Sequence, residues 1–285
     1  MAFRKTAISL AALAAVAATP AATAFAQQAE PERATEKPTI CSTVAWVADS
    51  TGVNLKKPGT GVITNNGTIS DPTSPFEKSL QPIKEVKKVI YDVLPGRSFH
   101  ETTSHGINGI DALKNINKDN KDIDCYLLQM GTNDAANISL GSTFTAEDRI
   151  KAVLENTGNS KVIWIAPQIS KDATVQGYTP AAADVLNKAL AQAEKDTPRL
   201  KIVSLPDKLK EAAGKVEGLP ATPDEFFVDG IHYKGMEVTY WMSDLIADSL
   251  KVEQPKDKVG DEVKKTKPES EAPSAETATM EPGEN

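Results

Sequence analysis

Residues 43–52 read TVAWVADSTG, an apolar run that ends abruptly in a polar turn. Four further runs share its length and character: KVIYDV at 88–93, IDCYLLQM at 123–130, KVIWIA at 161–166 and LKIVSL at 200–205. Apolar runs without polar alternation are typical of β-strands that are covered on both faces. The sequence therefore predicts five strands of a buried sheet.

Helical patterns separate these runs, and we expect helices at about 75–85, 106–117, 146–155, 180–195 and 235–250. Two of the helices have clear starts. Thr145 is a favoured N-cap residue before two acidic residues, and Thr179 precedes a proline at the first helical position. The alternation of strands and helices predicts an α/β protein with a parallel sheet between two layers of helices.

The first 26 residues predict a secretory signal peptide of the bacterial Sec type. A basic start at Arg4 and Lys5 precedes an apolar stretch, and the segment ends in an Ala-Phe-Ala cleavage site at Ala26. The apolar stretch is too short to span a bilayer and no later stretch is long enough, so we expect no integral membrane segment in the mature chain. The predicted location is secreted, extracellular or in the cell envelope.

Two changes in composition divide the rest of the chain. The last 34 residues lack aromatic side chains and nearly all aliphatic ones, so they cannot bury enough apolar surface to offset the entropy of ordering. We expect four parts: a signal peptide at 1–26, a flexible segment at 27–38, one domain at 39–251 and a disordered polar tail at 252–285. The net charge of −7 argues against nonspecific binding to nucleic acid or to an anionic membrane surface.

Cys41 and Cys125 are the only cysteines in the sequence. An exported chain meets an oxidising environment in which an even number of cysteines usually pairs, so we expect one disulfide, with two buried free thiols as the alternative. The histidines, at 100, 105 and 232, are too scattered to predict a metal site. We expect neither a metal nor a cofactor.

Three polar segments after predicted strands contain residue types that carry out acyl transfer. Ser50 directly follows the first run, where a serine is well placed as a nucleophile. Asn133 can donate a hydrogen bond to a developing oxyanion, and Asp229 precedes His232 by a spacing that lets the carboxylate orient the imidazole. Each segment alone is better explained by ordinary turn chemistry. Their occurrence together, in this order, indicates a serine hydrolase.

This combination resembles the SGNH, or GDSL-type, hydrolase family over about residues 40–250. The residues that carry the resemblance are Ala48-Asp49-Ser50 for the family's Gly-Asp-Ser block, Gly131-Thr132-Asn133-Asp134 for its Gly-x-Asn-Asp block and Asp229-Gly230-Ile231-His232 for its Asp-x-x-His block. The resemblance implies the SGNH hydrolase fold, a flavodoxin-like three-layer α/β/α sandwich with a five-stranded parallel sheet. It also implies that the third strand neighbours the first, which would pair Cys41 with Cys125.

The resemblance assigns a role to each matched residue. It implies Ser50 as the nucleophile, His232 as the general base and then acid, and Asp229 as the group that orients His232. The oxyanion hole would consist of the N–H groups of Ser50 and Gly96 and the side chain of Asn133. Gly96 is the best match to the family's second block, and Ala48 stands where the family has glycine, which bears on the packing around the serine.

The stretch DVLPGRS at 92–98 is also similar to extracellular SGNH domains that move acetyl groups on or off envelope polysaccharides. We therefore expect a secreted serine esterase that removes or transfers small O-acyl groups, chiefly acetyl, on cell-envelope carbohydrate. The alternatives are a lipase-like esterase for longer acyl chains and a catalytically idle glycan-binding module. His100 and His105 follow Gly96 and either line the cleft or are solvated loop residues.

Overall fold

The computed structural model describes residues 41–65, 69, 72–103 and 106–251. The predicted signal peptide, the flexible segment at 27–38 and the polar tail at 252–285 lie outside the described residues. His105 also lies outside them. Within the described ranges, no helix is long and apolar enough to cross a membrane.

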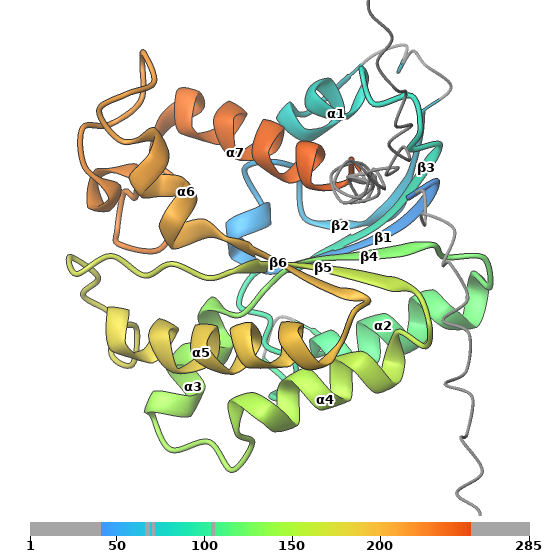
Figure 1. Ribbon diagram of the computed structural model, residues 1–285, viewed down its shortest axis with the longest axis horizontal. Helices are drawn as coiled ribbons and strands as arrows, with labels where there is room; N and C mark the ends of the chain where they lie inside the picture. Colours follow the sequence, from blue (N-terminus) through green and yellow to red (C-terminus); the bar gives the residue numbers. More distant parts are fainter. Residues whose placement is uncertain (1–40, 66–68, 70–71, 104–105, 252–285) are drawn as a thin grey trace, which may run out of the picture. The chain divides into compact units, whose positions relative to one another are not determined.

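A six-stranded sheet forms the centre of the fold, in the order β2-β3-β1-β4-β5-β6 (Figure 1). Its strands are β1 (Thr43–Ala48), β2 (Gly59–Thr64), β3 (Lys88–Val93), β4 (Cys125–Gln129), β5 (Lys161–Ala166) and β6 (Leu200–Ser204). Five strands are parallel, and β2 pairs antiparallel with β3 at one edge. The five parallel strands have the flavodoxin-like order, with β1 between β3 and β4.

Helices cover both faces of the sheet (Figure 1). One face carries α1 (Pro75–Leu80), α6 (Leu205–Ala212) and α7 (Gly235–Ser249), and the other carries α2 (Gly109–Asp119), α3 (Thr132–Ser139), α4 (Ala146–Asn156) and α5 (Pro180–Asp196). Both predicted helix starts are confirmed, since Thr145 forms a capping box with Asp148 and the Thr179 hydroxyl accepts from the Ala182 N–H. The expected three-layer α/β/α sandwich is therefore confirmed.

The packing of helices on both faces of the sheet explains why each parallel strand has an uninterrupted apolar sequence. Val44 and Trp46 of β1 pack into the core beneath α1 and α7, whereas Ala45 and Val47 pack into the core beneath α2, α4 and α5. Successive side chains of a strand point to opposite faces, so a strand between two helical layers needs apolar residues at every position. The central strand β1 is accordingly buried along almost its whole length.

The five predicted parallel strands are confirmed, and the sheet has in addition one antiparallel edge strand, β2, that the sequence does not predict. Its sequence, GTGVIT, is mostly exposed, as an edge strand with one hydrogen-bonded neighbour can be. Such a strand has no need of a continuous apolar run. The short helices α3 and α6 were also missed, and two 3₁₀ turns, η1 (Ser50–Gly52) and η2 (Pro223–Phe226), complete the described elements.

Cys41 and Cys125 form a disulfide, with their Cα atoms 5.4 Å apart. Cys125 begins β4 and lies opposite Val44, near the start of β1. The bond therefore joins the amino-terminal ends of two neighbouring parallel strands. Ser50 follows the carboxyl end of β1, so the disulfide and the candidate nucleophile lie at opposite ends of the sheet.

Candidate active site

Ser50 is presented by a tight 3₁₀ turn directly after β1. Asp49 caps this turn, and its carboxylate accepts hydrogen bonds from the Thr51 N–H at 2.8 Å and the Thr51 hydroxyl at 2.7 Å. A side chain at Gly52 would bring its Cβ within 2.6 Å of the Ala48 Cβ. The glycine at 52 thus makes room for the alanine at 48, the position where the resembled family has glycine.

His232 and Asp229 meet Ser50 from a distant part of the chain. The Nε2 atom of His232 lies 2.9 Å from the Ser50 Oγ, and its Nδ1 lies 2.7 Å from the Asp229 Oδ2. The structure thus brings the three predicted residues into one continuous line of hydrogen bonds. This arrangement allows an imidazole to take a proton from the serine while the carboxylate stabilises the resulting charge.

The Asp229–His232 turn is held by its own backbone. The second oxygen of Asp229 accepts from the N–H groups of Ile231 at 3.0 Å and His232 at 2.8 Å. Partial burial alone would raise the pKa of Asp229, but the hydrogen bonds from the His232 ring and these N–H groups lower it below its usual value. Asp229 is therefore ionised at neutral pH, as a residue that orients a histidine must be.

Gly230 is required at the centre of this turn. Its φ is +85°, a conformation that favours glycine, and an added Cβ would lie 2.4 Å from the Cα of Ala173. The Gly230 carbonyl also accepts from the Ser170 N–H at 2.9 Å. The loop between β5 and α5 thus supports the segment that carries Asp229 and His232.

Asn133 lies at the start of α3, just beyond the end of β4. Its buried amide nitrogen donates to the Arg97 carbonyl at 2.9 Å and faces the Asp49 Oδ2 at 3.4 Å. Its amide oxygen accepts from the Tyr178 hydroxyl at 2.6 Å. Asn133 is therefore fixed next to the turn that carries Ser50.

Gly96 lies in the loop after β3, one residue before Arg97, and its φ is +70°. The adjoining Arg97 is buried and pairs with Asp92 at 2.7 Å, while its carbonyl bonds to Asn133. The structure thereby connects the Gly96 loop to Asn133. In the part of the chain that the structure describes, Gly96 itself makes no hydrogen bond to Ser50 or Asn133.

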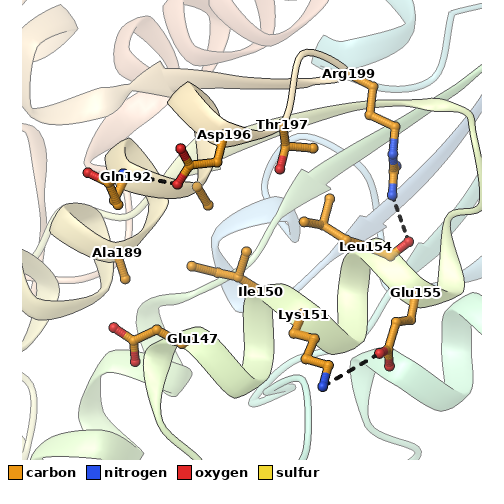
Figure 2. Close-up of a pocket in the computed structure, with 11 residues that line it drawn as sticks. Glu147, Ile150, Lys151, Leu154, Glu155, Ala189, Gln192, Asp196, Thr197 and Arg199 are labelled. Atoms are coloured by element: carbon orange, nitrogen blue, oxygen red, sulfur yellow. Dashed lines mark hydrogen bonds and ion pairs between the residues drawn. The ribbon is translucent and has the colours of Figure 1, made fainter. Parts of the chain in front are cut away.

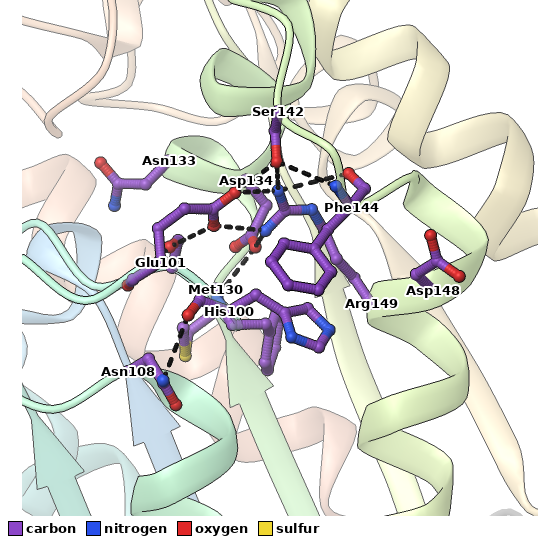
Figure 3. A network of polar contacts seen from close by, with 12 residues as sticks. His100, Glu101, Asn108, Met130, Asn133, Asp134, Ser142, Phe144, Asp148 and Arg149 are labelled. Carbon is purple, nitrogen blue, oxygen red and sulfur yellow. Dashed lines mark hydrogen bonds and ion pairs between the residues drawn. The ribbon is translucent and has the colours of Figure 1, made fainter.

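An ionic network around the buried Arg149 lies to one side of Asn133 (Figure 3). Arg149 of α4 bonds to Asp134 at 2.6 Å and also pairs with Glu101. Asp134 accepts the Phe99 N–H at 2.8 Å, so the network ties the Gly96 loop to α3 and α4.

Burial raises the pKa of Asp134 to about 7, although Arg149 opposes the rise. Burial would also raise the pKa of Glu101, but its bonds to Arg149 lower it below its usual range.

His100 belongs to the edge of this network. Its ring stacks on Phe144, with the ring centres 4.1 Å apart (Figure 3). Among the described residues it makes no hydrogen bond to Ser50 or His232, so His100 takes no part in the line of hydrogen bonds to the serine. Within the described ranges, no three histidine, cysteine, aspartate or glutamate side chains are grouped as metal ligands would be.

Two cavities differ sharply in their relation to this site. One of about 540 Å³ lies between α4 and α5, with Ile150 and Leu154 among its lining residues (Figure 2), and contains none of the residues named for catalysis. The other is only about 10 Å³ and is lined by Thr51, Thr132 and Ile231, which adjoin Ser50, Asn133 and His232 in the sequence. This small cavity is about the size of one water molecule, and neither Ser50 nor His232 lines it.

Sequence reasoning missed Tyr178, Glu101 and Arg149. Tyr178 lies in an irregular loop, where no periodic pattern marks a residue as functional. Arg149 follows two acidic residues on a helix and so is indistinguishable in sequence from an exposed charge. Only the tertiary structure brings Arg149 to Asp134 and buries both.

No protein-family model and no curated protein sequence matches this chain. Solved structures similar to it include a GDSL-like lipase from Parabacteroides merdae, at 13% identity over 75% of this chain and 99% of that one, with a TM-score of 0.51. They also include an acetylxylan esterase from Geobacillus stearothermophilus, at 15% identity over 75% and 97% of the two chains, with a TM-score of 0.50. At such low sequence identities, the similarity shows a shared fold.

Proposed function

We propose that this chain, which has the fold of the SGNH or GDSL-type hydrolases, is a secreted serine esterase that uses Ser50, His232 and Asp229. The observation that carries the proposal is the continuous line of hydrogen bonds from Asp229 through His232 to the Ser50 hydroxyl. A serine that is paired with an oriented imidazole is an activated nucleophile. Its place beyond the carboxyl ends of parallel strands is where α/β proteins bind their ligands.

The reaction we propose begins when the Ser50 Oγ attacks the carbonyl carbon of an ester. His232 Nε2 takes the serine proton, and the ionised Asp229 stabilises the imidazolium. The negative charge on the carbonyl oxygen is held by the N–H groups of Ser50 and Gly96 and by the Asn133 amide. His232 then gives its proton to the leaving alcohol oxygen, which leaves an acyl group on Ser50.

The second half of the reaction releases the acyl group. His232 takes a proton from a water molecule, whose oxygen attacks the acyl carbonyl, and then returns the proton to Ser50 as the carboxylic acid leaves. A sugar hydroxyl in place of water would yield acyl transfer. Asp229 is exposed and His232 half-buried, so water has access to the acyl-enzyme and hydrolysis is the expected main outcome.

We propose small acyl groups, chiefly acetyl, on envelope carbohydrate as the substrate. One structurally similar protein is named an acetylxylan esterase, and the resemblance of residues 92–98 to envelope acetyl-transfer domains favours the same chemistry. The signal sequence and the disulfide both fit an exported protein.

The experiment that tests this function compares acetyl, butyryl and long-chain p-nitrophenyl esters with purified mature protein. We expect kcat/KM to be highest for acetyl and to fall as the chain lengthens. A maximum at long chains would identify the lipase-like alternative. Glycan binding without turnover of any ester would identify the idle module and contradict the proposal.

A further inference from the structure

The loop at 167–179, between β5 and α5, contacts both halves of the candidate site. On one side, its Ser170 N–H bonds to the carbonyl of Gly230, in the turn that carries His232. On the other side, the Gly177 carbonyl accepts from the Ser139 hydroxyl at the end of α3. Tyr178 follows Gly177, and its position is thereby fixed relative to the helix that begins next to Asn133.

The Tyr178 hydroxyl donates to the Asn133 Oδ1 at 2.6 Å. Tyr178 is half-buried, and burial raises the pKa of its phenol, with further increases from the carboxylates of Asp49 and Asp134. The phenol therefore keeps its proton at neutral and mildly alkaline pH. Under those conditions it remains a hydrogen-bond donor toward Asn133.

The contacts of the Asn133 amide nitrogen favour the same amide orientation as the Tyr178 bond to its oxygen. Its nitrogen faces two acceptors, the Arg97 carbonyl at 2.9 Å and the Asp49 carboxylate at 3.4 Å. A rotation of the amide by half a turn would place its oxygen against both acceptors and its nitrogen against the tyrosine. Arg97 holds one N–H firmly, while the other is held only weakly, at the limit of hydrogen-bond length.

We infer that Tyr178 is a positioning residue that locks the Asn133 amide with its weakly held N–H ready for the substrate oxyanion. This inference rests on the proposed esterase function. Removing the phenol hydroxyl leaves the Asn133 oxygen without its donor, so that only the contacts with Arg97 and Asp49 hold the amide and its orientation becomes less fixed. Because an oxyanion donor acts mainly in the transition state, the loss should appear in kcat rather than in KM.

The test is a double-mutant cycle of Tyr178→Phe and Asn133→Ala on acetyl ester turnover. Tyr178→Phe alone should lower kcat about 3- to 10-fold, the range of one neutral hydrogen bond, with KM nearly unchanged. In the Asn133→Ala background the same change should cause no further loss. An equal loss in both backgrounds would overturn the inference, because Tyr178 would then act independently of Asn133. So would the absence of any effect on kcat.

Tyr126→Phe is the matched control. The Tyr126 hydroxyl donates to the Asn117 Oδ1 at 2.5 Å, a bond of the same type that involves β4 and α2 rather than the candidate site. This variant removes an equivalent hydrogen bond and should leave kcat unchanged. A comparable fall in kcat for both tyrosine variants would show a general effect of lost stability and would overturn the positioning role of Tyr178.

A measurement independent of turnover separates the inference from the function. In ¹⁵N-labelled protein, the Asn133 side-chain NH₂ should give two well-separated proton resonances, which should move together or broaden in Tyr178→Phe but not in Tyr126→Phe. If the protein shows this pattern but the wild type hydrolyses no ester, the proposed esterase function is contradicted and the positioning of Asn133 by Tyr178 is supported. If the wild type hydrolyses esters but Tyr178→Phe leaves the Asn133 resonances unchanged, the positioning role is contradicted and the esterase function is supported.

Discussion

The Ser50 hydroxyl lies 2.9 Å from the His232 Nε2, although 182 residues separate them in the sequence. The parallel sheet brings the two together, because Ser50 follows the carboxyl end of β1 and His232 lies in the loop between η2 and α7. The Asp229–His232 turn is local, whereas the contact with Ser50 depends on the whole fold. Substitutions in the candidate site and substitutions elsewhere in the fold can therefore be tested separately.

Asn133→Ala should reduce kcat about 10²- to 10³-fold, because one of the oxyanion donors that we propose is lost while the other two, the N–H groups of Ser50 and Gly96, remain. KM should change little, since the interaction forms chiefly in the transition state. Steady-state kinetics with an acetyl ester measure both constants. A rise in KM with kcat unaltered would place Asn133 in substrate binding instead.

Asp49→Asn should alter the pH dependence of stability. Burial raises the pKa of Asp49 from 3.8 to about 6, although its bonds to Thr51 oppose the rise. The folded protein therefore binds an extra proton between these values, so the Asp49 contribution to the free energy of unfolding falls as pH rises from about 4 to 6. An asparagine, which does not ionise, keeps the acceptor for Thr51 and removes this dependence.

Urea denaturation at pH 4 and pH 7 measures the effect. We expect the free energy of unfolding of Asp49→Asn, minus that of the wild type, to be larger at pH 7 than at pH 4. Asp184→Asn, at an exposed position on α5, is the control and should follow the wild type at both pH values. A constant difference between Asp49→Asn and wild type across this range would refute the buried ionisation.

Replacement of Cys41 and Cys125 by serine should lower the free energy of unfolding by about 2–4 kcal/mol, because the disulfide constrains the unfolded chain. The ester kcat should be unchanged, since the bond lies at the opposite end of the sheet from Ser50. Thiol titration of the denatured, nonreduced wild type gives an independent check. Two reactive thiols per chain would mean that the disulfide does not form.

Incubation with an acetyl donor and an envelope oligosaccharide should yield mostly free acetate. The exposure of Asp229 and the partial exposure of His232 favour attack by water on the acyl-enzyme. Mass spectrometry counts acetylated sugar against free acetate. A predominance of acetylated sugar would identify a transferase and leave the roles of Ser50, His232 and Asp229 intact.

The central strands were predictable from sequence because burial on both faces imposes an apolar residue at nearly every position. The same reasoning could not find β2, whose exposed edge position removes that requirement. Helix α3 was missed because its first turn includes Asn133 and Asp134, polar side chains that are buried by partners elsewhere in the chain. Helix prediction from an apolar face fails where the buried face is polar.

The candidate site was predictable where its residues adjoin strand ends or lie close together in sequence. Ser50 and the Asp229–His232 pair meet these conditions. Tyr178 and Arg149 do not, because their importance arises from contacts with Asn133 and Asp134 that only the tertiary structure creates. Short-range sequence patterns therefore identify the residues that we propose to react better than they identify the residues that hold them in place.

The most direct test of the central claim is ester turnover by Ser50→Ala, with Ser79→Ala on α1 as the matched control. We expect kcat for p-nitrophenyl acetate to fall by several orders of magnitude in Ser50→Ala, with an unchanged circular dichroism spectrum and melting temperature. Ser79→Ala should retain wild-type turnover. Wild-type turnover in a folded Ser50→Ala protein would contradict the assignment of Ser50 as the nucleophile.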